Sequence, residues 1–101
     1  MKEKSTSYRW PTIFSKTNEN NELIVYVEVP GFEKEDVSIT YIHRTVIVDA
    51  RKENHFQIPH KCKFFIPNEW CIEKGKATIK NGMLILTFLP KVSNTTRIEI
   101  E

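Results

Sequence analysis

The stretch Lys76-Ala77-Thr78-Ile79-Lys80-Asn81-Gly82-Met83-Leu84-Ile85-Leu86-Thr87-Phe88-Leu89-Pro90 predicts a β-hairpin. Asn81-Gly82 is the kind of pair that a two-residue hairpin turn prefers, because such a turn needs positive φ. Residues 76–80 form the first predicted strand. Residues 83–89 form the return strand, which sets Leu84, Leu86 and Phe88 on one face. Pro90 ends the unit, since proline cannot donate to a strand ladder.

The same alternation of apolar and polar side chains extends toward the N-terminus. It predicts further strands over 22–29, 37–42, 45–50 and 61–66. The first of these places four aliphatic side chains on one face, namely Leu23, Val25, Val27 and Val29. No stretch has apolar residues at helical spacing for long enough to predict a helix. Several short strands separated by turn signals predict an all-β fold, an immunoglobulin-like β-sandwich of antiparallel strands.

Two turns between these strands differ in quality. Pro30-Gly31 is a good turn signal, because proline pre-sets the first position and glycine accepts positive φ at the second. His43-Arg44, between 37–42 and 45–50, lacks the residues that a two-residue turn favours. Either the loop is longer than it looks, or the residues at its ends are strained.

Composition excludes several classes of function. The 101 residues allow one domain, and the hydrophobic fraction of 40% with 28% charged residues is ordinary for a globular protein. A net charge of +2, spread along the chain, does not indicate nucleic-acid binding. No apolar run approaches the length of a membrane span, and residues 1–7 lack the apolar stretch of a signal peptide. We therefore expect a cytoplasmic protein with no nucleic-acid or membrane partner.

The nucleophilic and metal-binding side chains form no recognised set. Cys62 and Cys71 match neither a redox pair nor a zinc knuckle, and we expect both to be reduced. A cluster of His55, His60 and Cys62 would need a fourth ligand and fits no standard spacing, so a chance loop composition is favoured. No phosphate-binding loop or nucleophile motif is present. We predict no enzyme activity, no cofactor and no metal.

Four segments together resemble the α-crystallin domain of small heat-shock proteins. The first is Val29-Pro30-Gly31-Phe32-Glu33-Lys34-Glu35-Asp36-Val37, and the second is Phe64-Phe65-Ile66-Pro67. The third is Ala77, which stands five residues before the glycine of Gly82-Met83-Leu84. The fourth is Ile98-Glu99-Ile100. The resemblance covers about residues 20–101. It implies an N-terminal arm over 1–20, an α-crystallin domain over 21–90 and a C-terminal extension over 91–101.

The resemblance also implies how chains assemble. Side chains two apart in a strand point the same way, so Ile98 and Ile100 can enter two pockets of a neighbouring chain while Glu99 faces water. The family resemblance puts the acceptor groove between residues 37–42 and the strand starting near 76. The expected wall residues are Val37, Ile39 and Tyr41 opposite Ile72, Thr78 and the stems of Lys74 and Lys76.

Two features leave alternatives open. The segment 51–60 is shorter than the loop that prokaryotic and plant relatives swap between subunits, so an edge-paired dimer of the animal type or another arrangement is open. The aromatic and aliphatic residues of the arm are expected to contact clients, or to pack on the domain as a first strand. They are Tyr8, Trp10, Ile13 and Phe14.

The resemblance predicts an ATP-independent chaperone that holds partly unfolded client proteins and assembles with itself into dimers and larger oligomers. One alternative is a CS-type adaptor, which shares the sandwich but docks on one specific partner. Another is a structural or accessory protein that uses the sandwich for a single assembly contact.

Overall fold

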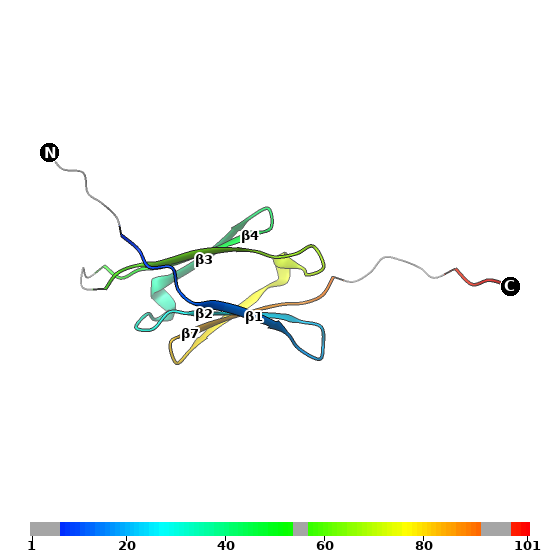
Figure 1. Ribbon diagram of the computed structural model, residues 1–101, viewed down its shortest axis with the longest axis horizontal. Helices are drawn as coiled ribbons and strands as arrows, with labels where there is room; N and C mark the ends of the chain where they lie inside the picture. The colour runs from blue at the N-terminus through cyan, green and yellow to red at the C-terminus, as the bar shows by residue number, and fades with distance from the viewer. Residues whose placement is uncertain (1–6, 54–56, 92–97) are drawn as a thin grey trace.

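The computed structural model describes residues 7–53, 57–91 and 98–101. Within these residues the chain forms two layers of antiparallel strands (Figure 1). In chain order the strands are β1 (Ile13–Thr17), β2 (Leu23–Glu28), β3 (Val37–Ile42), β4 (Thr45–Ala50), β5 (His60–Phe65), β6 (Lys76–Lys80) and β7 (Met83–Phe88). The all-β sandwich predicted from the sequence is therefore confirmed.

The two sheets have four and three strands. The larger has the order β1-β2-β7-β6 and the smaller the order β3-β4-β5. The Asn81-Gly82 hairpin joins β6 to β7, with Lys80 opposite Met83. Both turn residues have positive φ, 53° and 76°, as the hairpin reading requires. Gly31 also has positive φ, at 86°, in the turn after β2.

The core lies between the sheets and is built by the predicted alternation. Leu23, Val25, Val27 and Val29 are all buried, and Val27 and Val29 are fully covered. The other sheet supplies Val46, Val48, Ala50 and Cys62, and β7 supplies Leu84, Leu86 and Phe88. A one-residue change of register would turn each of these sets to solvent, so the apolar pattern fixes the pairing.

Two single-turn 3₁₀ segments were not expected from the sequence. They are η1 (Lys34–Asp36) and η2 (Ile72–Lys74), each leading into an edge strand. At η1, the backbone N–H of Glu33 donates to the Asp36 carboxylate at 2.8 Å. In the described part of the chain, neither helical segment has the length and apolarity to cross a bilayer.

The turn between β3 and β4 is short, and its first residue is strained. Ile42 pairs with Thr45, so the loop is His43-Arg44 alone, and His43 has φ of 59°. The Arg44 guanidinium compensates by donating to three backbone carbonyls, those of Ile66 at 2.7 Å, Pro67 at 2.9 Å and Trp70. This clamp ties the hairpin to the connection that follows β5.

The segment before β1 closes one side of the sandwich. Arg9 bridges to the start of β5, its N–H donating to Pro59 at 2.8 Å and its carbonyl accepting from Lys61 at 3.0 Å. The chain then continues through Pro11, which is buried, and joins the other sheet as β1. Figure 1 shows this segment in blue as it crosses from one layer to the other. The alternative in which the arm packs on the domain as a first strand thus holds for residues 13–17. The division at residue 20 remains a prediction.

Candidate docking groove

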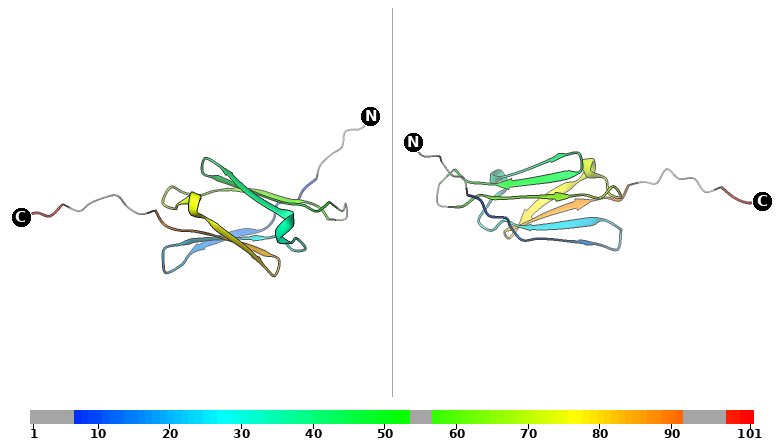
Figure 2. Two further views of the ribbon diagram at one scale, coloured as in Figure 1. Left: turned by 180° about the vertical axis from the view of Figure 1, so that it is seen from behind. Right: turned by 45° about the horizontal axis from the view of Figure 1, so that its top comes forward.

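The opposite side of the sandwich is bounded by two edge strands. β3 is the last strand of one sheet and β6 the last strand of the other. Seen from behind, these two strands run alongside each other on the side nearest the viewer (Figure 2, left). Edge strands carry backbone N–H and C=O groups that a further strand can pair with. A groove between two such edges is suited to binding an extended peptide.

Two cavities follow this seam. The first, about 240 Å³, is lined on the β3 side by Ile39, Thr40 and Tyr41, and on the far side by η2 and the start of β6. Leu86 and Phe88 form its floor. Gly75 packs closely against this floor, because a Cβ there would lie 2.6 Å from the Phe88 ring. The local sequence thus places a residue without a side chain where the backbone approaches the ring.

The second cavity, about 500 Å³, lies toward the other end of the seam. Val37 and Ile39 line its β3 wall, and Ala77, Thr78 and Ile79 its β6 wall. Ile39 belongs to both cavities, so they are adjacent along β3. Two adjoining apolar cavities on one edge match the geometry of a strand that presents alternate side chains.

Of the seven predicted wall residues, the five that are not lysines all line this groove. Val37 and Thr78 belong to the larger cavity, Tyr41 and Ile72 to the smaller, and Ile39 to both. The Lys76 side chain also lines the smaller cavity, whereas Lys74 lines neither. The structure therefore brings the predicted wall residues together; their binding of a tail remains a proposal.

Sequence reasoning missed the inward side of β6. Thr78 pairs with Ile85, on the face opposite to the core, whereas Ala77 and Ile79 pair with Leu86 and buried Leu84. Ala77 and Ile79 therefore supply the inward side chains of this wall. Period-two alternation counted back from Leu84 across the hairpin would have found them.

The groove carries a few charges at its ends. Lys34 lines the larger cavity, and Glu73 and Lys76 line the smaller. Hydrogen bonds from the backbone N–H of Glu73 itself and from the Cys71 thiol, with the charges of Lys91 and Arg44, lower the pKa of the Glu73 carboxyl. The lining of the groove is thus mainly apolar, and its charged residues are Lys34, Glu73 and Lys76.

The predicted tail residues are the most exposed large apolar side chains that the structure describes. Ile98 is 85% exposed and Ile100 97% exposed. In a single chain, the apolar groove and the two isoleucines are therefore both accessible. Burying such side chains in a groove is favourable by the hydrophobic effect.

The four arm residues divide between two environments. Tyr8 and Trp10 are about half exposed. Ile13 packs against the core, opposite buried Val27. Phe14 points to the outer side of the larger sheet, where its ring stacks on Tyr26 at 4.8 Å. Three of the four thus keep exposed apolar surface, while Ile13 is largely committed to folding.

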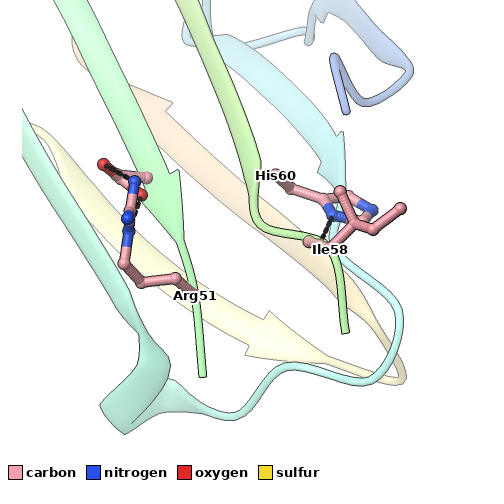
Figure 3. Close-up of polar contacts among 4 residues, drawn as sticks. Arg51, Ile58 and His60 are labelled. Carbon is pink, nitrogen blue, oxygen red and sulfur yellow. Dashed lines mark hydrogen bonds and ion pairs between the residues drawn. The ribbon is translucent and has the colours of Figure 1, made fainter. Parts of the chain in front are cut away.

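The suggested metal cluster is not assembled by the described residues. The Nδ1 atom of His60 faces the Ile58 carbonyl at 3.1 Å (Figure 3), and its ring packs edge-on against Phe32. Cys62 is fully buried, and burial raises the pKa of its thiol to about 11. His55 lies outside the described residues. No group of three metal-ligating side chains occurs among residues 7–53, 57–91 and 98–101.

Comparison with known proteins agrees with this architecture. The family model described as Hsp20/alpha crystallin family matches residues 15–101. The chain belongs to the Hsp20/alpha crystallin family. The expectation drawn from the turn, hairpin and tail segments is thereby confirmed.

Individual relatives of this Hsp20-family chain are distant. A probable Hsp20 family chaperone of Onion yellows phytoplasma is 24% identical over 86 residues, covering 72% of this chain. The match spans 62% of that relative's length. A small heat-shock protein from Xylella fastidiosa has a TM-score of 0.75 at 16% identity, covering 94% of this chain and 99% of the other. Heat shock protein 16.0 from Schizosaccharomyces pombe has a TM-score of 0.68 at 21% identity, covering 93% and 77%. These structures support the fold.

Proposed function

We propose that this Hsp20-family chain is an ATP-independent holdase that binds partly unfolded proteins in the cytoplasm and prevents their aggregation. The observation that carries the proposal is the open apolar groove between the edge strands β3 and β6, in a family of small heat-shock chaperones. The naming of one relative as a probable Hsp20 family chaperone supports the same role. Exposed apolar surface captures unfolding chains by the hydrophobic effect and needs no nucleotide.

We further propose that chains assemble when Ile98 and Ile100 of one chain enter the groove of another. Burying two isoleucines contributes roughly 3–6 kcal/mol before costs. Ordering the segment and losing free motion offset much of this, so a single tail binds weakly. Several tails in one assembly act together through effective concentration, which gives oligomers whose subunits exchange. The Xylella relative, whose structure is described as a distinct high order structure, supports self-association.

The chaperone role is tested by the thermal aggregation of citrate synthase, followed by light scattering. We expect suppression at stoichiometric amounts of the full chain, with and without ATP. Ovalbumin at the same mass concentration controls for nonspecific crowding. Equal aggregation with the chain and with ovalbumin would remove the holdase proposal.

Tail docking is tested by native mass measurement of three proteins. They are the full chain, a version ending at Thr96, and the full-length Ile98→Ser/Ile100→Ser variant, which keeps the length. We expect both altered proteins to remain folded and to have lower mass. An assembly of unchanged mass would exclude the tail as the organising contact, and a strictly monomeric full chain would favour the CS-type adaptor instead.

A further inference from the structure

The outer side of the four-stranded sheet carries more apolar surface than a solvent-facing sheet needs. β2 reads Leu23-Ile24-Val25-Tyr26-Val27 and β7 reads Met83-Leu84-Ile85-Leu86, so both are apolar on both faces. One face of each strand forms the core. Strands that are apolar on both faces are typical of sheets covered on both sides. In Figures 1 and 2, no other described segment covers the outer side of this sheet.

The strand register brings the second set of side chains into one patch. Phe14, Tyr26 and Ile85 lie directly opposite one another across β1, β2 and β7. Ile24 and Met83 lie on the same face in the neighbouring rows. The rings of Phe14 and Tyr26 stack with 15° between their planes, and Phe14 remains 49% exposed. We call these five residues the outer patch.

The outer patch is surrounded mainly by lysines. Lys16 and Lys76 stand at the two ends of the row that contains Ile24, and Lys80 ends the row that contains Met83. The Lys16 ammonium lies 5.9 Å from the centre of the Tyr26 ring. Among the strand residues of this face Glu28 is the acidic one, against Lys16, Lys76 and Lys80, so the strands present an excess of positive charge here.

This charge decides between two occupants. A second copy packing face to face would bring lysines against lysines, which is unfavourable at short range. An extended apolar segment that carries Asp or Glu would instead pair its apolar side chains with the patch and its carboxylates with the lysines. Apolar burial would supply the affinity, and the charges would supply the selection.

We propose that the outer patch is a client-binding surface for extended, apolar segments bearing acidic residues. The inference rests on the proposed holdase function and adds a location distinct from the β3–β6 groove. The exposed phenylalanine of the arm, Phe14, then acts from a fixed strand and does not require a free arm.

The test measures the binding of two fluorescently labelled unfolded proteins to the full chain by anisotropy. One is reduced, carboxymethylated α-lactalbumin, which is acidic, and the other is reduced, carboxamidomethylated lysozyme, which is basic. We expect the chain to prefer the acidic protein. Phe14→Ser should weaken binding of both about fivefold, since it removes roughly half of a phenylalanine burial. Lys16→Glu/Lys80→Glu should weaken binding of the acidic protein roughly tenfold and strengthen binding of the basic one.

Phe65→Ser is the matched control. Phe65 also lies on an edge strand, points outward from the other sheet and is 64% exposed, more than Phe14. We expect the affinity of this variant for both proteins to stay within about twofold of the wild type. This is much less than the tenfold change in affinity that about 1.4 kcal/mol produces. Ile85→Thr, on a central strand, repeats the Phe14 test where strand detachment cannot explain a loss.

The outcomes separate the two proposals. Equal losses in Phe65→Ser and Phe14→Ser, or an unchanged preference for the acidic protein in Lys16→Glu/Lys80→Glu, would overturn the outer patch while the holdase role stands. Failure of the wild type to bind either unfolded protein would remove the holdase proposal itself. Circular dichroism of each variant shows whether the sandwich is intact.

Discussion

Replacing Arg44 by methionine should destabilise the domain more than replacing any other surface charge that the structure describes. The guanidinium donates from Nε to Ile66 and from a terminal nitrogen to Pro67 and Trp70, 22 to 26 residues away. It therefore holds the β3–β4 hairpin to the connection that leads into η2. Methionine keeps much of the apolar stem but leaves three part-buried carbonyls without this donor.

The expected loss follows from the bonds removed. A hydrogen bond from a charged donor contributes roughly 1.5–3 kcal/mol, and water can partly replace it at a half-buried site. We therefore expect a loss of about 3 kcal/mol in the free energy of unfolding. For a domain of this size, that corresponds to a Tm lowered by roughly 12 to 24 °C. Arg44→Lys should lose about half as much, because lysine keeps the charge but not the planar fork.

The assay is urea unfolding followed by tryptophan fluorescence, at two protein concentrations, so that loss of assembly is distinguished from loss of folding. Arg51→Met is the matched control, since Arg51 contacts Asp49 at 2.9 Å but is half exposed. Such an exposed pair contributes less than about 1 kcal/mol. If Arg44→Met and Arg51→Met lower the free energy of unfolding by the same amount, the hydrogen bonds of Arg44 are not what holds the β3–β4 hairpin to the connection after β5.

Three further predictions test other parts of the fold. Gly82→Ala should lower stability by about 1–2 kcal/mol in urea unfolding, because φ is +76° and the new Cβ would lie 3.3 Å from Pro30 Cα; unchanged stability would contradict the hairpin geometry. In native protein, a thiol reagent should label Cys71 alone, because Cys62 is buried with its pKa raised to about 11; rapid labelling of both would show that the core opens readily. Hydrogen bonds from Lys52, then from the Glu33 N–H, lower the pKa of Asp36, so its stabilising effect is present above the unfolded pKa and is lost as pH falls through the lower folded value. Asp36→Asn should therefore flatten the dependence of the urea midpoint on pH between about pH 5 and about pH 2, and a slope equal to the wild type would refute this reading.

Strand positions could be predicted because each strand alternates with period two and is bounded by strong turn residues. The bounds of β3, β4 and β6 agree with the sequence prediction, those of β2 and β5 differ by one residue at each end, and β7 ends one residue earlier than predicted. For β1 the sequence offered only a first strand in the arm as an alternative, without these bounds. The Arg44 clamp could not be predicted in this way. Its acceptors are backbone carbonyls far along the chain, and any residue type can supply a carbonyl.

The groove could be located from the family resemblance, but its walls needed the register. Thr78 was predicted as a wall residue, yet the pairing of β6 with β7 turns Ala77 and Ile79 inward on either side of it. The outer patch escaped notice for a related reason. Tyr26 and Ile85 sit between core residues in the sequence, and an apolar run does not tell which of its two faces is covered.

The position of the open edges constrains how tail docking, if it occurs as proposed, would build an assembly. A sandwich of two open sheets has four edges, here β1, β3, β5 and β6, and Arg9 lies along part of the β5 edge. The groove uses β3 and β6, while the docking segment follows β7 in the sequence. Donor and acceptor are therefore different surfaces of one chain.

Contacts between unlike surfaces are heterologous, and they close into rings or cages only when the rotation between neighbours permits it. Otherwise they grow without limit. The geometry of the linker over 91–97 would therefore decide whether an assembly of fixed size or a distribution of sizes results, even with the docking contact unchanged.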